Sequence, residues 1–470
     1  MQKQITINEI KNNITQSREL AVKSLMNSGN ANMDQENMGG YRILAEGCYA
    51  PNDDIRSGFN NNDLIIGGSG SGKTGGYVIP NIRGGFGSMI VADTKSRLYR
   101  MLGKEMERKG YRVQVLDFVN PENSCVYNPL DYIRENKSDY SADRYSNKDI
   151  VSLARALVPT TTSDDAFWQD SARTVMTFLL AFTMEALVPE EHTMMSLVEL
   201  YRMLGTEKGR KTFEMWCEEH PKSFAAKKYA MFSGLLPADR TWACVMQFVT
   251  EAIDLFDFEE IRTMFNRTEN KIDIRKIGYE KTILFLNVSD TNRYVDRLVN
   301  LFYTQAMQVM CEEADKMENG RLPVPVRFIL DDFAANIYIE NFDRIISVIR
   351  SRNISASIIL QSLTQLHSMY SPEQAGTIIS NCDHMLYLGG QDITTAQYIG
   401  LRANRTEDKI MTMPLGKAYF IERGKMAVMA DKITPYAKEN EEDNWMELDL
   451  SDEDIFLDHF LEEETKKTSD

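Results

Sequence analysis

Short apolar segments alternate with amphipathic helical patterns through the first and last thirds of the chain. The predicted buried strands cover 63–66, 88–92, 111–116, 282–286, 326–330 and 355–360. The predicted helices in these regions cover 98–108, 295–317 and 339–350. Apolar runs separated by helices are typical of parallel strands joined by crossover helices. The pattern therefore predicts an α/β fold with a mostly parallel sheet.

Weaker strand patterns flank this sheet. Residues 41–44 predict a lead-in strand, 385–388 and 418–421 predict two more strands, and 426–429 completes a final hairpin. The segment 1–60 is rich in Asn, Gln, Ser and Gly, so we expect an N-terminal arm that ends in the lead-in strand.

Between residues 136 and 270 the strand signal fades and long helical patterns replace it, punctuated by Pro189, Pro221 and Pro237. We therefore expect an all-α insert over 136–270 that interrupts a sheet domain made of 61–135 and 271–437. One helical pattern starts at Phe167 and Trp168. A large aromatic residue at the start of an apolar helix is more often part of the core, although Trp168 could instead contact a substrate.

A phosphate-binding loop follows the first buried strand, and an amphipathic helical segment that ends at 79–81 follows the loop. The spacing G-x-x-x-x-G-K-[ST] is matched by Gly67, Gly68, Ser69, Gly70, Ser71, Gly72, Lys73 and Thr74. Its glycines allow consecutive N–H groups to face inward, and the positive end of the next helix adds to the field on a bound polyphosphate. Lys73 would reach the β- and γ-phosphates of ATP, and the Thr74 hydroxyl would ligate Mg²⁺. A glycine-serine linker matches this spacing by chance on the order of once in a hundred chains of this length.

Asp331 and Asp332 directly follow the buried strand 326–330. Acidic residues at the end of a strand, downstream of a phosphate loop, form the second motif that nucleotide hydrolysis requires. Asp331 would hold Mg²⁺ through water, and Asp332 would orient or deprotonate the attacking water. Turns often place two aspartates after an apolar run, so the assignment depends on the pairing with the loop at Gly67.

Three further candidates flank the strand 355–360. Gln361 follows it, and in multi-subunit motor ATPases a polar residue at the tip of a strand between the two phosphate motifs senses the γ-phosphate. Arg350 and Arg352 precede it. Arginines in this position either complement the dipole of the preceding helix or insert into the neighbouring subunit's site, and both interpretations stay open for Arg350.

Composition sets the broad class. The 470 residues are 43% hydrophobic, enough for two or three domains with a sizeable core. Six cysteines without C-x-x-C spacing fit reduced thiols in a cytosol. No apolar run approaches the ~18 residues of a membrane span, and the polar start lacks the features of a signal peptide, so we expect a soluble chain.

The net charge of −16 is concentrated near the C-terminus. Residues 439–470 hold 14 Asp and Glu and 2 Lys, a net −12, which leaves −4 for the first 438 residues. Charge therefore does not exclude a DNA partner. Apolar residues interrupt this acidic tail, 438–470, at roughly helical spacing. The tail either docks on a basic face of the substrate, a processing protein or a neighbouring subunit, or it is a solvated, solubilising segment.

Taken together, the motifs resemble the TraG/TraD family of type IV secretion coupling proteins, the hexameric ATPases of bacterial conjugation. The match extends over about 60–400. It is carried by the phosphate loop, Val78-Ile79-Pro80-Asn81, Asp93-Thr94-Lys95, Tyr127-Asn128-Pro129-Leu130, Phe167-Trp168, Leu330-Asp331-Asp332-Phe333, Arg350-Ser351-Arg352-Asn353-Ile354, Gln361-Ser362 and Gln365-Leu366.

The resemblance implies a RecA-like nucleotide-binding domain interrupted by an all-α domain that faces the cytoplasm and helps to select substrate. It also implies a homo-hexamer around a channel, which delivers a relaxase with its single-stranded DNA to a type IV secretion channel. By position, Arg350 matches the family's arginine finger and Gln361 its third motif.

The sequence departs from the family in two places. Family members usually carry N-terminal membrane helices, which this sequence lacks, so we expect a cytoplasmic protein held at the inner face of the membrane by a separate anchoring partner. Their Asp-Glu pair is Asp331-Asp332 here. Two rival functions stay open, namely a double-stranded DNA pump of the FtsK/HerA kind and a nucleotide-gated docking receptor that hydrolyses little.

Overall fold

The computed structural model describes residues 40–94, 96–136, 144–159, 166–265, 269–289, 294–333 and 337–433. The predicted arm before residue 40, Lys95 and the predicted acidic tail lie outside these residues. Within the described part of the chain, no helix combines the length and the apolarity needed to cross a membrane.

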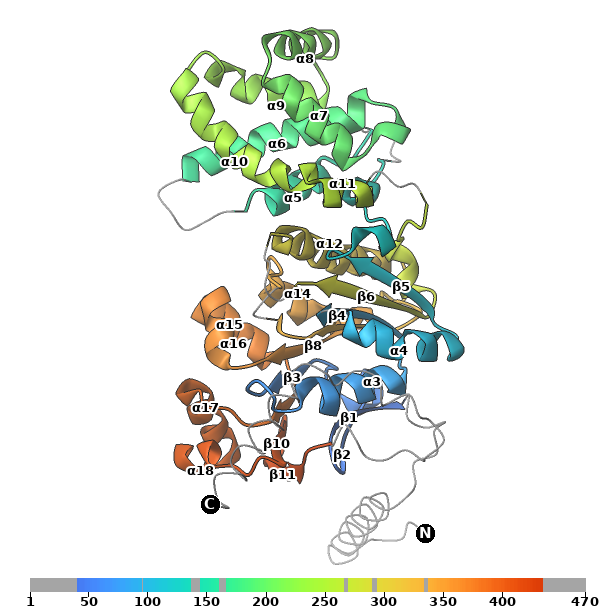
Figure 1. Ribbon diagram of the computed structural model, residues 1–470, viewed down its shortest axis with the longest axis vertical. Coiled ribbons are helices and arrows are strands. Elements are labelled where there is room, and N and C mark those ends of the chain that lie inside the picture. Colours follow the sequence, from blue (N-terminus) through green and yellow to red (C-terminus); the bar gives the residue numbers. More distant parts are fainter. Residues whose placement is uncertain are drawn as a thin grey trace, which may run out of the picture. The chain divides into compact units, whose positions relative to one another are not determined.

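A nine-stranded sheet forms the centre of the described fold, with the strand order β11-β10-β9-β3-β8-β7-β4-β6-β5 (Figure 1). Its strands are β3 (Asp63–Ile66), β4 (Ser88–Thr94), β5 (Arg112–Asp117), β6 (Thr282–Val288), β7 (Val326–Leu330), β8 (Ile354–Leu360), β9 (His384–Tyr387), β10 (Lys417–Glu422) and β11 (Val428–Asp431). β9 to β5 pair in parallel, and β10 and β11 are antiparallel. The predicted α/β class and its mostly parallel sheet are confirmed.

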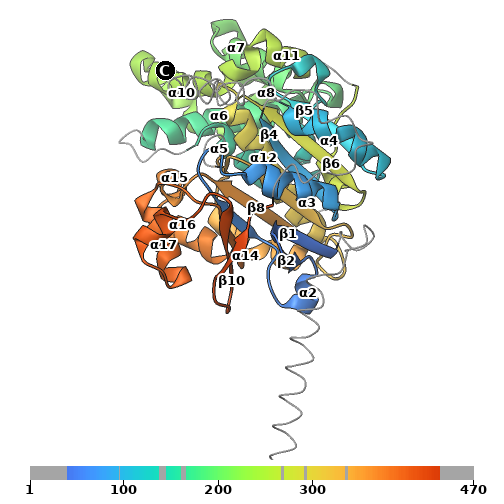
Figure 2. The same cartoon turned by 60° about the horizontal axis from the view of Figure 1, so that its bottom comes forward.

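Helices cover both faces of the sheet, because successive residues of a strand point to opposite sides. On β3, Leu64 and Ile66 join the core that includes α12 (Asp296–Asp315) and α14 (Phe342–Val348). Ile65 faces the other core, with α3 (Ile79–Gly84) and α4 (Arg97–Arg108). Figure 2 shows α3 and α4 side by side on their face of the sheet. Every residue of β3 is buried, so its carboxyl end is held firmly where the phosphate loop begins.

Four further helices follow the later strands of the sheet. α15 (Leu363–Met369) and α16 (Pro372–Ser380) follow β8, and α17 (Ile393–Ala403) and α18 (Glu407–Met411) follow β9. A short helix, α2 (Asp54–Ser57), precedes β3. The predicted lead-in strand is β1 (Tyr41–Ala45), which pairs with β2 (Cys48–Pro51), a strand that was not predicted, in a separate two-stranded sheet.

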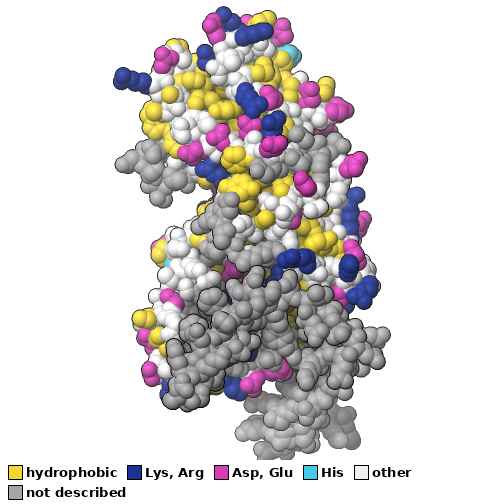
Figure 3. All heavy atoms as spheres, viewed as in Figure 1, with side chains coloured by type: hydrophobic (Ala, Val, Ile, Leu, Met, Phe, Trp, Pro, Cys, Tyr) yellow, Lys and Arg dark blue, Asp and Glu magenta, His cyan; other side chains and the backbone are white. Residues whose placement is uncertain are grey.

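The stretch between β5 and β6 contains helices and short helical turns. Its α-helices are α5 (Asn147–Leu157), α6 (Ala166–Ala186), α7 (Met194–Leu204), α8 (Glu207–Glu219), α9 (Phe224–Phe232), α10 (Asp239–Asp257) and α11 (Glu259–Phe265). Pro189, Pro221 and Pro237 all lie between these helices, as predicted. Figure 3 shows hydrophobic, acidic and basic side chains intermixed over this group of helices.

Aromatic packing holds this helical group together. The Phe178 ring on α6 contacts the rings of Phe213 on α8 and Phe232 on α9 at centroid distances of 5.3 and 5.4 Å. Trp168 is half-buried and packs against the same core, in line with the core interpretation. Phe167 beside it is 58% exposed.

Two predicted helix boundaries were wrong. The helix after the phosphate loop was expected to end at 79–81, but α3 continues to Gly84, because Pro80 lies in its first turn, where a missing N–H costs no hydrogen bond. The helix predicted over 339–350 is shorter. α14 ends at Val348 and a 3₁₀ turn, Arg350–Arg352, follows it.

Candidate nucleotide-binding site

The loop from Gly67 to Lys73 joins the end of β3 to a π-helical turn, Thr74–Val78, that leads into α3. Gly70 and Gly72 have φ values of +67° and +92°, which side chains with a Cβ rarely adopt. At Gly67, a Cβ would overlap the Ser71 hydroxyl. The shape of the loop, a tight turn that exposes its backbone, therefore requires glycine at positions 67, 70 and 72.

Main-chain hydrogen bonds attach the loop to the ends of two neighbouring strands. Gly67 N donates to Leu360 O at 3.0 Å, where β8 ends, and Gly68 N donates to Gly389 O at 2.9 Å, just after β9. Gly389 has a φ of +93°. This contact was not predicted from the sequence, although two consecutive glycines after a predicted strand are a usable signal.

Lys73 lies inside the loop. Its ammonium donates to Gly67 O at 2.8 Å and to Gly68 O at 3.0 Å, and the side chain is buried. Burial lowers the pKa of Lys73, and the negative charges of Asp332 and Asp331 oppose this change. The loop therefore holds a positive charge directly against its own backbone.

Thr74 and Asp331 meet beside that lysine. Thr74 Oγ1 donates to Asp331 Oδ2 at 2.8 Å. Burial, together with the charge of Asp332, raises the pKa of Asp331 to about 6, while the Thr74 hydrogen bond and Lys73 act in the opposite direction. A hydroxyl and a carboxylate side by side are oxygen donors of the kind that Mg²⁺ prefers, so the pair fits that ion.

Asp332 is the next residue after Asp331 and has a φ of +49°. Its N–H donates to Asp331 Oδ1 at 3.1 Å. Aspartate and asparagine tolerate this left-handed conformation better than most residues with a Cβ. The turn gives the two adjacent carboxylates different surroundings, since Asp331 bonds Thr74 while Asp332 is left at the end of β7.

Gln361 follows β8, and β8 lies between β3 and β7 in the sheet. This is the topology on which the sensor hypothesis depends. The backbone N–H of Gln361 donates to Gln365 Oε1 at 3.0 Å, and the Gln361 side chain is exposed. Gln361 therefore lies at the same edge of the sheet as Gly67 and Asp331.

Arg350 lies at the opposite end of β8. This strand has seven residues, so at about 3.3 Å per residue its ends are roughly 20 Å apart, too far for Arg350 to reach the phosphate loop of the same chain. Its Nη2 donates to Asp54 O at 2.9 Å, and its Nε lies 3.7 Å from Asp54 Oδ2. Arg352, by contrast, donates to Val348 O, the last carbonyl of α14, at 3.1 Å. Arg352 also pairs with Asp315 at 2.9 Å, so of the two arginines it is Arg352 that contacts the C-terminal end of α14.

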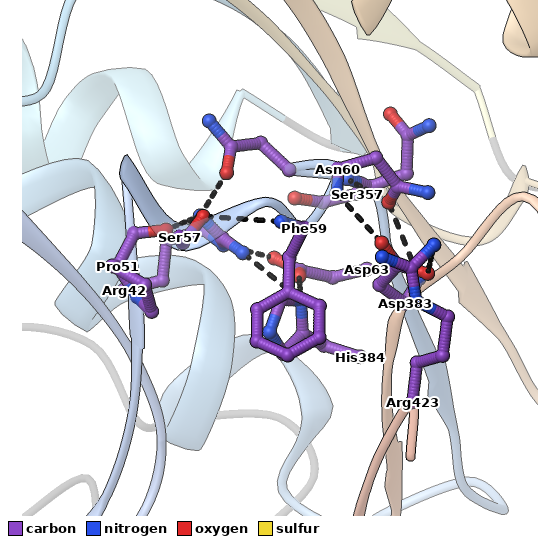
Figure 4. A network of polar contacts seen from close by, with 12 residues as sticks. Arg42, Pro51, Ser57, Phe59, Asn60, Asp63, Ser357, Asp383, His384 and Arg423 are labelled. Atoms are coloured by element: carbon purple, nitrogen blue, oxygen red, sulfur yellow. Dashed lines mark hydrogen bonds and ion pairs between the residues drawn. The ribbon is translucent and has the colours of Figure 1, made fainter. Parts of the chain in front are cut away.

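A buried charge cluster lies at the start of β3 (Figure 4). Asp63 Oδ2 accepts from Arg42 Nε at 2.8 Å, from Arg327 Nη1 at 3.3 Å and from the Tyr77 hydroxyl at 2.6 Å. Burial alone would raise the pKa of Asp63, but Arg42, Arg327 and His384 lower it overall. Tyr77 belongs to the π-helical turn after the loop, so this cluster ties that turn to the start of β3.

This buried charge cluster was not predicted from the sequence. Arg42 is 21 residues from Asp63, and Arg327 is 264 residues away. Figure 4 also shows Phe59 over His384, with ring centroids 5.4 Å apart, and Arg423 beside Asp383 at 3.2 Å. No local pattern signals such contacts, although a charged residue at the start of an apolar strand needs a partner once it is buried.

The strand order and the loop define the class of the fold. A phosphate loop after β3, a carboxylate pair after β7 and the intervening β8 form a RecA-like P-loop nucleotide-binding fold. The chain belongs to the family described as type IV secretory system conjugative DNA transfer, whose model matches residues 8–406. This confirms the resemblance to TraG/TraD-type coupling proteins.

Solved structures agree on the fold. The bacterial conjugative coupling protein TrwBdeltaN70, in its unbound monoclinic form, aligns with a TM-score of 0.61 at 15% identity over 83% of this chain and 88% of that one. Plasmid coupling protein TrwB in complex with ADP and Mg²⁺ has a TM-score of 0.61 at 15% identity, over 84% and 89% of the two chains. A search among curated proteins found no significant match.

Proposed function

We propose that the protein is an ATP-driven coupling protein that recruits a relaxase with its single-stranded DNA and delivers it to a type IV secretion channel. The observation that carries the proposal is the 2.8 Å contact between Thr74 and Asp331 beside the buried Lys73. Family membership supplies the conjugative context.

Each residue of the site has a distinct role in this proposal. The N–H groups of residues 67–74 bind the phosphates, and Lys73 exchanges its bonds to Gly67 and Gly68 for phosphate oxygens. Thr74 and Asp331 would hold Mg²⁺, which when bound neutralises phosphate charge. Asp332 orients the attacking water or accepts its proton, and Gln361 contacts the γ-phosphate. TrwB structures that contain ADP with Mg²⁺ or a non-hydrolysable ATP analogue support ATP and Mg²⁺ as ligands.

The proposal includes a homo-hexamer around a channel. Arg350 lies at the edge of the sheet opposite the phosphate loop, so it can act on a nucleotide only in a neighbouring subunit. A ring in which each subunit turns its Arg350 edge toward the next subunit's loop satisfies this requirement.

The helical group α5–α11 serves as the substrate-selecting insert in this proposal, and 61–135 with 271–437 form the nucleotide-binding domain. Exposed apolar side chains on the helical surface, including Phe167, Met215 and Met231, are 58–66% exposed and available to a protein partner. Attachment to the inner face of the membrane is assigned to a separate anchoring protein.

The rate of ATP hydrolysis, measured without DNA, with single-stranded DNA and with double-stranded DNA, tests the proposed motor activity. The purified chain should hydrolyse ATP faster with single-stranded DNA than without DNA, and the Lys73→Ala variant should not respond. Stronger stimulation by double-stranded DNA would favour a pump of the FtsK/HerA kind. Nucleotide binding without stimulated hydrolysis would favour a docking receptor. Capture of a purified relaxase by the chain would separate a coupling protein from a chromosome pump.

A further inference from the structure

The chain returns to the phosphate loop directly after its last strand. Lys432 follows β11, and its Nζ donates to Ser71 O at 3.0 Å. The next residue also lies close to the site, since Ile433 O is 3.0 Å from where a Cβ on Gly76 would be. The segment 432–433 therefore contacts both the phosphate loop and the π-helical turn that follows it.

This segment is held by the sheet. Lys432 N donates to Gly416 O at 2.9 Å, and Asp431 pairs with Lys417 in the β10–β11 ladder. The contact at Gly76 leaves little room for a side chain at that position, and only glycine avoids it. The position of Lys432 beside the loop is thus fixed by main-chain pairing on one side and close backbone packing on the other.

The charge of Lys432 is poorly compensated. Two other lysines of the same hairpin have acidic partners, Lys417 with Asp431 at 2.6 Å and Lys425 with Glu422 at 2.7 Å. Within the described ranges, by contrast, no acidic side chain lies within 4.0 Å of Lys432 Nζ, and its hydrogen bond is to a neutral carbonyl. The side chain is half-buried, and burial lowers its pKa.

A partly desolvated cation without an acidic partner is costly unless an anion compensates it. The two lysines at this loop share one arrangement, since Lys73 donates to the carbonyls of Gly67 and Gly68 and Lys432 donates to that of Ser71. Phosphate oxygens are stronger acceptors for an ammonium group than neutral carbonyls are. A bound polyphosphate would therefore attract both side chains.

We propose that Lys432 is a second cation of the nucleotide site, contributed by the C-terminal hairpin, that binds the phosphates together with Lys73. The proposal rests on nucleotide binding at Gly67–Thr74 and adds a residue that the phosphate-loop motif does not contain. It also makes β11 a part of the site, so that nucleotide binding would stabilise the hairpin.

The test measures dissociation constants of the full chain for Mg²⁺–ADP and for a non-hydrolysable ATP analogue by isothermal titration calorimetry. Lys432→Met should weaken binding of both about tenfold, because one charge-assisted hydrogen bond is lost. Lys432→Arg should retain most of the affinity. Lys425→Met, the matched control from the same hairpin, should bind like the parent. The difference between Lys432→Met and the parent should shrink as salt screens the charge.

Several results would overturn the proposal. Equal nucleotide affinity of Lys432→Met and the parent would do so. Equal weakening by Lys432→Met and Lys432→Arg would also do so, because it would show that the shape of the side chain matters and its charge does not. A lowered melting temperature without nucleotide, with unchanged affinity, would show that Lys432 only ties β11 to the loop. Failure of the parent to bind either nucleotide would instead overturn the proposed function, and this inference with it. Lys73→Ala provides the reference for a disabled site.

Discussion

Thr74 Oγ1 donates a 2.8 Å hydrogen bond to Asp331 Oδ2 across 257 residues of sequence. This contact joins the turn after the phosphate loop to the end of β7, with the whole helical group α5–α11 inserted between them in the chain. The two oxygen donors approach each other because β3 and β7 are parallel and separated only by β8. Parallel strands end at one edge, and that edge is where open α/β sheets bind ligands.

Lys73→Ala should reduce DNA-stimulated ATP hydrolysis at least ~100-fold, because the phosphates lose the charge that stabilises the transition state. Steady-state phosphate release in the presence of single-stranded DNA measures this. Lys109→Ala is the control, since Lys109 pairs with Glu105 on the exposed side of α4. Equal rates for Lys73→Ala and the parent would show that the site is wrongly assigned.

Arg350→Ala should abolish hydrolysis in homogeneous oligomers, because each site loses the finger from its neighbour. Mixed with an equal amount of Lys73→Ala protein, it should recover activity, since random mixing pairs an intact site with an intact finger at roughly a quarter of the interfaces. Arg352→Ala is the matched control from the same turn and should leave hydrolysis unchanged. No recovery in well-mixed oligomers would argue against a shared site.

Asp93 should make stability depend on pH. It lies at the end of β4 and accepts from the N–H groups of Leu98 and Tyr99, both at 2.8 Å. Burial raises its pKa from 3.8 to about 6, although these hydrogen bonds act in the opposite direction. Between these two pH values the native state holds more protons on Asp93 than the unfolded state, so the contribution of Asp93 to the free energy of unfolding decreases as pH rises and levels off above about 6.

Asp93→Asn removes this titration but keeps the shape of the side chain. The free energy of unfolding of the parent, minus that of Asp93→Asn, should therefore fall by on the order of 2–3 kcal/mol between pH 4 and pH 7. Urea unfolding at several pH values measures the difference, in which contributions from other carboxylates cancel. A difference that stays constant with pH would contradict the raised pKa of Asp93.

The elements predicted correctly from the sequence are those with a local signature. The strand 63–66 and the loop after it were predicted because an apolar run leads directly into a glycine spacing. β7 was predicted because an apolar run ends at Asp331. Helix ends were less certain, since Pro80 marks a boundary in sequence but fits the first turn of α3.

The parts of the site that the sequence did not predict are assembled by long-range contacts. Lys432 is 361 residues from Ser71, and no motif marks it. Asp63 appeared only as the first residue of a strand, because its partners come from β1, β7 and β9. The position of Arg350 could not be predicted either, since the direction of β8 in the sheet decides at which edge Arg350 lies. The pairing and direction of the strands decide which residues meet at the site, and residue type alone does not reveal them.

Asp332 supports the most specific prediction about catalysis. It is one methylene shorter than the glutamate that the family usually places there. A catalytic carboxylate must come within hydrogen-bond reach of the attacking water, and a displacement of roughly 1 Å can cost about 10²-fold in rate. The left-handed turn at Asp332, with its φ of +49°, redirects the chain directly after Asp331. We expect a slow basal ATPase that reaches its full rate only in an assembled ring with DNA.

Asp332→Asn should nearly abolish the DNA-stimulated rate while leaving Mg²⁺–ADP affinity unchanged, because asparagine accepts the same backbone conformation but cannot accept the proton. Asp332→Glu should raise basal hydrolysis, since the longer side chain reaches further toward the water, although glutamate tolerates the left-handed turn less well. Single-turnover hydrolysis, with nucleotide affinity measured in parallel, separates the chemical step from binding. If Asp332→Asn retains full stimulated turnover, Asp332 is not the base, and either another carboxylate or the docking-receptor function must replace this assignment.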